Sequence, residues 1–232
     1  MGVARYSDFP VSLKTLPKVG GGLDPNIEAI VALRPDVVLM AVSSRAHERL
    51  QSLGIKVLAL ETKTHADVRR VLAVVGQLLQ IPAPQGADRV WRLIDAGMNA
   101  AAQSLPASTK NAKVYFEVNR APYAAGASSF IGETLTRLQV KNIIGPELGP
   151  FPKINPEFVV RANPDIIMVG DRNYQGMSDR PGWAAIRAVK DKRVCIFKPD
   201  DSDVLVRPGP RMAEGARIMA QCLADVAQRK AP

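Results

Sequence analysis

The chain has 232 residues, a formal net charge of +9, and 47% hydrophobic against 23% charged residues, a composition typical of a globular protein with a buried core. No apolar run reaches the length of a membrane span. The basic residues are scattered, without the interleaved aromatic residues of a single-strand-binding groove, which argues against a nucleic-acid-binding protein. Cys195 and Cys222 are too few for a disulfide framework. Because both lie in apolar runs, we expect two buried free thiols, with a single bridge between them as the alternative.

The first predicted elements are a short helix and a strand near the start of the chain. Asn26 is a candidate N-cap, and Glu28 lies in the first turn, where a carboxylate suits the positive end of the helix dipole. Pro35 ends the helix because the residue before a proline disfavours helical geometry. The apolar residues 37–40 then fit a strand buried on both faces, and a second strand is predicted at residues 56–60.

Two longer helices are predicted in the middle of the chain, separated by Pro82 and Pro84. Apolar residues keep a helical period over residues 68–79 and again over residues 90–105. The second helix covers about 20 residues, or roughly 30 Å, which is long enough to join two lobes as a stiff connector.

The second half of the chain repeats the first. Asn155 matches Asn26 and Glu157 matches Glu28, at one offset of 129 residues and without a gap. The copy again reads as a capped helix followed by an apolar strand. The other elements predicted in this half are strands at 113–118 and 193–197 and helices at 129–138 and 210–228. Because strands alternate with helices, the sheets are expected to be parallel.

We therefore predict an α/β protein with two lobes, each containing a parallel-type sheet flanked by helices, and one long rigid helix between the lobes. The N-terminal lobe covers residues 1–82, the connecting helix 83–109, and the C-terminal lobe 110–232.

Polar and aromatic residues gather at four predicted loops, which cover residues 6–10, 120–126, 149–152 and 203–211. Several of these loops adjoin strand ends, and open α/β sheets bind their ligands at the carboxyl ends of the strands. Aromatic residues together with Arg and Asp suit a large ligand that has apolar faces and some anionic groups.

Motifs for catalysis or for a resident metal are missing from the sequence. His47 and His65 stand in no metal-ligand spacing, and the glycines at 20–22 lack the Lys-Ser/Thr of a phosphate-binding loop. No Gly-x-Ser-x-Gly elbow occurs. We expect a protein that is not an enzyme, with no catalytic residues and no cofactor.

The repeat, the loops and the connecting helix together resemble the helical-backbone, or class III, periplasmic substrate-binding proteins of ABC importers. These proteins receive cobalamin, ferric siderophores or haem, and the likeness is closest to the cobalamin-binding members. The stretches most similar to the family are residues 6–10, 26–36, 52–57 and 202–211.

The resemblance implies roles for individual residues. In the family, two lobes hold the ligand between them, and one glutamate in each lobe docks into basic pockets of the permease. The residues implied to line the ligand cleft are Tyr6, Tyr123, Phe151, Asp203 and Arg207. The glutamates implied to dock are Glu28 and Glu157, for which stabilisation of the helix dipole is the alternative role. We expect a monomer that binds a small-molecule metal chelate and an ABC permease, and no nucleic acid.

The location of the protein depends on the start of the chain. Residues 1–10 contain no apolar signal region, which alone would indicate a cytoplasmic protein. Members of the family begin with an export signal and a strand–helix pair before the segment that matches residues 6–10. The resemblance therefore implies that the N-terminal lobe lacks its first strand and helix, that the export signal lies upstream or has been removed, and that the protein is periplasmic or extracytoplasmic.

Other ligands and functions stay open at this point. Cobalamin binders have additional tryptophans in the cleft where this chain has Gly22-Leu23 and Ala41-Val42, so a ferric siderophore or haem is an alternative ligand. A cytoplasmic nitrogenase-like or chelatase-like α/β enzyme is a second alternative, and it would need Cys or His metal ligands at the cleft. A third is a cytoplasmic interaction module that kept the fold.

Overall fold

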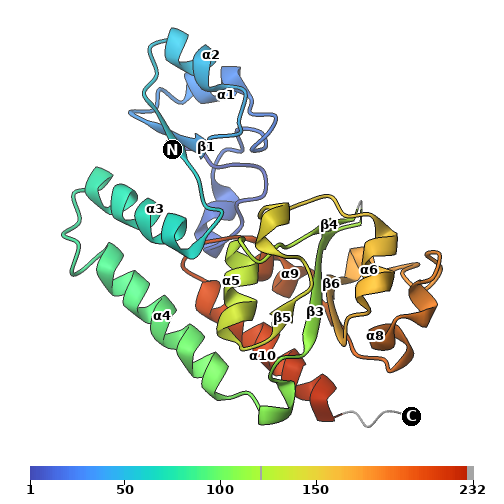
Figure 1. Ribbon diagram of the computed structural model, residues 1–232. Helices are drawn as coiled ribbons and strands as arrows, with labels where there is room; N and C mark the ends of the chain where they lie inside the picture. Colours follow the sequence, from blue (N-terminus) through green and yellow to red (C-terminus); the bar gives the residue numbers. More distant parts are fainter. Residues whose placement is uncertain (121, 229–232) are drawn as a thin grey trace. The chain divides into compact units, whose positions relative to one another are not determined.

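The computed structural model describes residues 1–120 and 122–228. The chain forms two compact units, Met1–Glu61 and Thr62–Pro232 (Figure 1). Strands and helices alternate along both units, as the sequence predicts.

The two middle helices belong to the second unit. They are α3 (His65–Leu78) and α4 (Ala87–Gln103). Thr64 caps α3 through a capping box with Asp67. The observed division differs from the predicted lobes 1–82 and 110–232 and their connector, because the apolar face of α4 is buried in the core of the second unit. The long helix predicted within residues 83–109 is present as α4.

The first unit is small. Its elements are the 3-10 helix η1 (Val11–Thr15), the helices α1 (Ile27–Ala32) and α2 (His47–Ser52), and the strands β1 (Val38–Ala41) and β2 (Val57–Leu60). The two strands pair in parallel, with Val38 opposite Val57. The buried core consists of Ile30, Ala46 and Leu50, against which partly buried residues of both strands pack.

A five-stranded sheet forms the centre of the second unit. Its strands are β3 (Lys113–Asn119), β4 (Tyr123–Ala124), β5 (Lys141–Asn142), β6 (Ile166–Gly170) and β7 (Val194–Phe197). The order is β4-β3-β6-β7, with β5 also paired to β3, and all pairs are parallel except β3–β4. Residues 166–169 of β6 are all buried, as expected for a central parallel strand.

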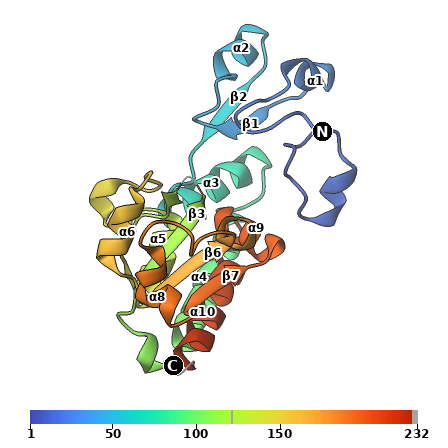
Figure 2. The ribbon, with the colours of Figure 1, turned by 90° about the vertical axis from the view of Figure 1, so that its right-hand side faces the viewer.

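Helices cover both faces of this sheet (Figures 1 and 2). Val114 and Phe116 of β3 face a core shared with α4, α5 (Phe130–Arg137) and α10 (Met212–Gln228). Tyr115, which points to the opposite face, packs in a second core with residues of α6 (Pro156–Ala162) and α8 (Arg187–Lys190). The alternation of side chains along a strand accounts for the two cores.

The prediction of two free thiols is wrong, because Cys195 and Cys222 form a disulfide. Cys195 lies on β7 with its side chain in the core that α10 covers, and Cys222 lies on the buried side of α10. Their Cα atoms are 5.9 Å apart. Two residues that fill one core from a strand and from its covering helix are thus close enough to bond. Closing the chain over 27 residues stabilises the fold by roughly 2–4 kcal/mol in the chain-entropy model.

One predicted loop is in part a helix. Residues Pro199–Val206 form α9, so Asp203 lies in a helix and not in a loop. Pro199 at the first position and Asp200 and Asp201 in the first turn start this helix. The remaining short elements are η2 (Ala107–Thr109), η3 (Pro146–Leu148), α7 (Asp171–Tyr174) and η4 (Trp183–Ala185). Among the described residues, no helix combines the length and apolar character needed to cross a membrane.

Candidate functional site

The carboxyl ends of the parallel strands in the second unit lie at one edge of the sheet. Figure 1 shows β4 and α9 at the same end of β3. Strands β6 and β7 end here as well, and α7 and α9 begin directly after them. This edge is where an open α/β sheet binds its ligand, and we call it the carboxyl edge.

Asp203 and Arg207 form an ion pair at the carboxyl edge. The Arg207 Nη2 donates to Asp203 Oδ2 at 2.7 Å, and the side chains are 34% and 43% exposed. The spacing of four residues places both groups on one side of α9 and its C-terminal end. Because the pair is half exposed, its guanidinium and carboxylate can also reach a ligand in solvent.

Tyr123 and Phe151 come from two segments that pair with each other. The amide of Ala124 donates to the carbonyl of Pro152 at 3.0 Å. The Tyr123 side chain is 41% exposed, which leaves it available to a ligand, although Ala121 in the same predicted loop lies outside the described residues. The Phe151 ring is half-buried, with its centre 5.9 Å from that of Phe130. Phe151 therefore packs on the core and has less surface to offer.

Tyr6 belongs to the first unit and is 68% exposed. The Arg5 guanidinium lies 6.0 Å from the centre of its ring and pairs with Asp24 at 2.9 Å. An ion pair this exposed contributes little to stability, about 0–1 kcal/mol. The aromatic surface of Tyr6 is thus largely open to solvent.

Glu28 and Glu157 are both exposed, one in each unit. Each lies in the first turn of a helix capped by an asparagine, since Asn26 Oδ1 accepts from the amide of Ala29 and Asn155 Oδ1 accepts from the amide of Glu157, both at 2.9 Å. No ion pair involves either carboxylate within residues 1–120 and 122–228. The two glutamates thus match in local structure as they do in sequence.

A buried ion pair that the sequence analysis did not single out lies under the carboxyl edge. Glu117 is on β3 with a fully buried side chain, and its two oxygens accept from Arg180 at 2.6 and 2.8 Å. The Arg180 guanidinium also lies 4.4 Å from the centre of the Trp183 ring. The hydrogen bonds to Glu117 raise the pKa of Arg180, and burial raises the pKa of the nearby Tyr115 phenol far above its usual range.

This ion pair fixes the segment that follows β6. Arg180 donates to the carbonyl of Asn173 at 3.4 Å, and the Asn173 amide donates to the carbonyl of Val118 at 3.2 Å. Tyr174, 39% exposed, and the exposed Arg172 lie in this segment and are further candidates to contact a ligand. Their signal in the sequence was their position directly after the apolar strand of the second repeat.

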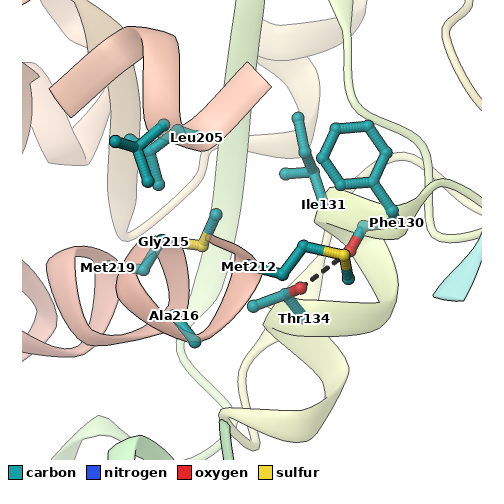
Figure 3. A pocket seen from close by; sticks show the side chains of 9 residues that line it. Phe130, Ile131, Thr134, Leu205, Met212, Gly215, Ala216 and Met219 are labelled. Atoms are coloured by element: carbon teal, nitrogen blue, oxygen red, sulfur yellow. Dashed lines mark hydrogen bonds between the residues drawn. The ribbon is translucent and has the colours of Figure 1, made fainter. Parts of the chain in front are cut away.

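A gap among three helices of the second unit is too small for a chelate (Figure 3). It lies among α5, α9 and α10, has a volume of about 10 Å³, and is lined mainly by apolar side chains such as Leu205 and Met212. The hydroxyl of Thr134 beside it donates to the carbonyl of Phe130 at 2.7 Å. A space of this size holds one water molecule at most, so it is a packing gap. The described residues contain no group of three His, Cys, Asp or Glu side chains placed to hold a metal ion.

Fold and surface together define an α/β protein that offers aromatic and ionic groups at strand ends. A family model described as periplasmic binding protein matches residues 1–200. The chain belongs to this family, whose class III members are the substrate-binding proteins of ABC importers.

Relatives and solved structures agree with this membership. An uncharacterized ABC transporter substrate-binding lipoprotein of Bacillus subtilis, YvrC, is 28% identical over 96% of this chain and 72% of the relative. The vitamin B12-binding protein of Salmonella paratyphi A is 27% identical over 97% of this chain and 83% of the relative. The fold is similar to that of the periplasmic heme-binding protein BhuT, with a TM-score of 0.81, 21% identity, and coverage of 98% of this chain and 89% of the other.

These findings confirm the predicted family and α/β fold class and the prediction that the protein is not an enzyme. The enzyme alternative is not supported, and its condition of Cys ligands at a cleft is not met, because Cys195 and Cys222 are bonded to each other. Family membership implies a small-molecule ligand, a permease partner and an extracytoplasmic location.

Proposed function

We propose that this protein captures cobalamin or a related corrinoid and delivers it to the permease of an ABC importer. The proposal rests chiefly on one observation, that an exposed tyrosine and a half-exposed Asp203–Arg207 pair lie at the carboxyl edge. A flat macrocycle with amide side chains needs aromatic surface for its faces and charged groups that accept and donate hydrogen bonds. The similarity to the vitamin B12-binding protein of Salmonella paratyphi A supports this ligand class.

Each residue of the proposed site has a distinct role. In the second unit the ring of Tyr123 packs on a face of the ligand, and Phe151 adds apolar surface next to it. Tyr6 is the aromatic residue that the first unit offers to a ligand. Asp203 and Arg207 bond the polar groups at the rim of the macrocycle. No cofactor takes part, since the metal enters and leaves as part of the ligand.

Haem or a ferric siderophore is the second candidate. Leu23 is 78% and Val42 is 52% exposed, at positions where cobalamin binders have tryptophan. Aliphatic residues there offer less stacking surface to a corrin ring. The Arg207 guanidinium would serve equally well for a propionate or a hydroxamate oxygen, and the fold is similar to that of a heme-binding protein.

Titration calorimetry with cyanocobalamin, haemin and a ferric hydroxamate tests the proposed ligand class. We expect saturable one-to-one binding of cyanocobalamin, tighter than binding of the other two. Tight binding of haemin or the hydroxamate, without binding of cyanocobalamin, would instead support haem or a ferric siderophore as the ligand. Absence of binding to all three at tens of micromolar would contradict both.

We also propose that Glu28 and Glu157 dock the protein, as an extracytoplasmic monomer, onto basic pockets of the permease. Exposure of both carboxylates supports this role. The alternative is a stabilising interaction with the helix dipole, of about 0.3–1 kcal/mol. Glu28→Gln and Glu157→Gln are expected to reduce uptake without changing ligand affinity.

Matched controls for docking exist in each unit. Glu48 and Glu214 are also exposed and also lie in the first turn of a helix, α2 and α10 respectively. Uptake assays in cells should show normal transport for Glu48→Gln and Glu214→Gln. An equal loss of uptake in the test and control variants would mean that any first-turn glutamate has this effect, through its interaction with the helix dipole. That result would contradict docking.

A further inference from the structure

A polar pocket lies at the amino ends of the strands in the second unit, opposite the carboxyl edge. Figure 1 shows the start of β3 and the end of α10 at this same end of the unit. The pocket has a volume of about 250 Å³. Its lining residues include Ser108, Thr109, Lys110, Asn111, Asp165 and Arg193. That volume is sufficient for a small anion with its hydration shell, and the pocket is separate from the proposed ligand site.

Arg193 is the unusual member of this lining. It directly precedes β7, and its Nε is buried without a hydrogen-bond partner among the described residues. A buried guanidinium donor without a hydrogen bond costs free energy. A hydrogen-bond acceptor bound at this point would therefore be stabilising.

The carboxylate in the pocket is bonded to groups other than Arg193. Asp165 Oδ1 accepts from Arg187 at 2.8 Å, and Asp165 Oδ2 accepts from the amide of Lys113 at 2.9 Å. Both oxygens are therefore engaged with other donors. Lys110 adds a second positive charge to the lining, and no ion pair within residues 1–120 and 122–228 involves it.

The remaining surface of the pocket suits an oxyanion that is partly desolvated. The Ser108 hydroxyl and the Asn111 side chain are further polar groups of the lining, whereas the Thr109 hydroxyl donates to the carbonyl of Pro106 at 2.8 Å. Ile166 and Val226 form an apolar part of the lining, which lowers the local polarity and strengthens the attraction between an anion and the two cations. The neighbouring segment 187–192 adds Arg187, Lys190 and Lys192 against one acid, Asp191.

We propose that this pocket binds a phosphate-type oxyanion, held by Arg193 and Lys110. The Arg193 guanidinium and the Lys110 ammonium donate to the oxygens of the anion, and the Ser108 hydroxyl adds a further donor. Two sources present this chemistry, free inorganic phosphate and the phosphate of an anionic lipid headgroup.

The test uses the full chain and two probes. Heteronuclear NMR with inorganic phosphate should shift the Arg193 Nε–Hε signal and the amides of Asn111 and Ala112, with saturation. Sedimentation with phosphatidylglycerol vesicles, against phosphatidylcholine vesicles, tests the headgroup. A saturable response to either probe supports the pocket and identifies the source.

Matched variants distinguish binding in the pocket from the non-specific attraction of an anion to a positively charged protein. Arg193→Met keeps the aliphatic stem, and Lys110→Met changes an exposed residue. Each should weaken binding at least tenfold while the melting temperature stays near that of the wild type. Arg217→Met, which removes one exposed charge on α10, should bind as the wild type does. The proposal is overturned by no response to either probe, or by an equal loss in Arg217→Met.

Discussion

The two copies of the helix–strand repeat have the same local structure and different surroundings. Helices α1 and α6 both follow an asparagine cap, and Ile30 and Val159, at the repeat offset, are both buried. The strands differ, because Leu39 on β1 is 43% exposed whereas its counterpart Met168 on β6 is fully buried. A repeat therefore specifies its own helix and strand, and the number of neighbouring elements decides how much of it is buried.

The difference extends to the whole units. The first unit has a two-stranded sheet over a small core, and the second has a five-stranded sheet with two cores and a disulfide. We expect the second unit to be the stable part of the molecule and the first to open more readily.

Loss of the buried ion pair should have the largest effect. Arg180→Met would leave the fully buried Glu117 carboxylate without a positive partner and with only the hydrogen bond from the Tyr115 hydroxyl at 3.4 Å among the described residues. We expect the second unit to lose about 3–5 kcal/mol of unfolding free energy. Guanidinium denaturation followed by tryptophan fluorescence measures this, since Trp91 and Trp183 both belong to that unit. Arg217→Met is the control and should change stability by less than about 0.5 kcal/mol. A small loss of unfolding free energy in Arg180→Met would contradict a fully formed Glu117–Arg180 ion pair in solution.

Truncation of the paired strand residues compares the units directly. Met168→Ala should destabilise the second unit by about 2–5 kcal/mol, because it opens a cavity in a packed core. Leu39→Ala should cost the first unit less than about 1 kcal/mol, since much of the side chain is already in solvent. Hydrogen exchange of the amides in β6 and β1 measures each loss. Equal losses would mean that β1 is as well covered as β6.

Reduction of the disulfide should weaken the second unit alone, by roughly 2–4 kcal/mol. Denaturation with and without reductant measures the loss. The variant with both Cys195→Ala and Cys222→Ala should have the same free energy of unfolding with and without reductant, because the chain has no other cysteine. A change in hydrogen exchange of the first unit upon reduction would contradict an effect confined to the second unit.

A smaller effect is expected from pH at the start of the second unit. Burial lowers the pKa of His65, with Glu133 opposing this shift, and His65 Nε2 lies 3.0 Å from the carbonyl of Phe130. The unfolded histidine takes up a proton near pH 6.5, whereas the folded one resists until lower pH. The contribution of His65 to the free energy of unfolding should therefore be constant above the unfolded pKa. It should fall as the pH drops below that pKa, and the loss is complete once the pH has passed through the lowered folded pKa. His65→Gln should remove this part of the pH dependence, measured by denaturation between pH 7.5 and pH 5, the range in which histidines titrate. An unchanged dependence would assign it to other groups.

The sequence was sufficient for the elements that depend on local chemistry. The caps at Asn26 and Asn155, the end of the helix before Pro35 and the apolar strand of the second repeat all lie where their patterns predict. The sequence analysis misses the helix α9, although Pro199 and the acidic first turn signal its start, because the ionic residues Asp203 and Arg207 and the prolines after them suggest a loop.

Features that depend on long-range packing were not predictable. The Cys195–Cys222 bond requires knowing that α10 covers β7, and the pair of Glu117 with Arg180 joins residues 63 positions apart. Apolar surroundings indicate burial of a cysteine and do not reveal its partner. The cleft residues Tyr6, Tyr123, Phe151, Asp203 and Arg207 stay predictions.

The most direct test of the proposed binding site is a comparison of ligand affinity between two arginine variants. Arg207→Met removes the charged group at the carboxyl edge, and Arg217→Met removes an exposed one on α10. Calorimetry with the chelate that the wild type binds should show affinity reduced by about 10- to 100-fold for Arg207→Met, as for loss of a charge-assisted hydrogen bond, and unchanged affinity for Arg217→Met. Equal affinity of Arg207→Met and the wild type would contradict a ligand site at the carboxyl edge.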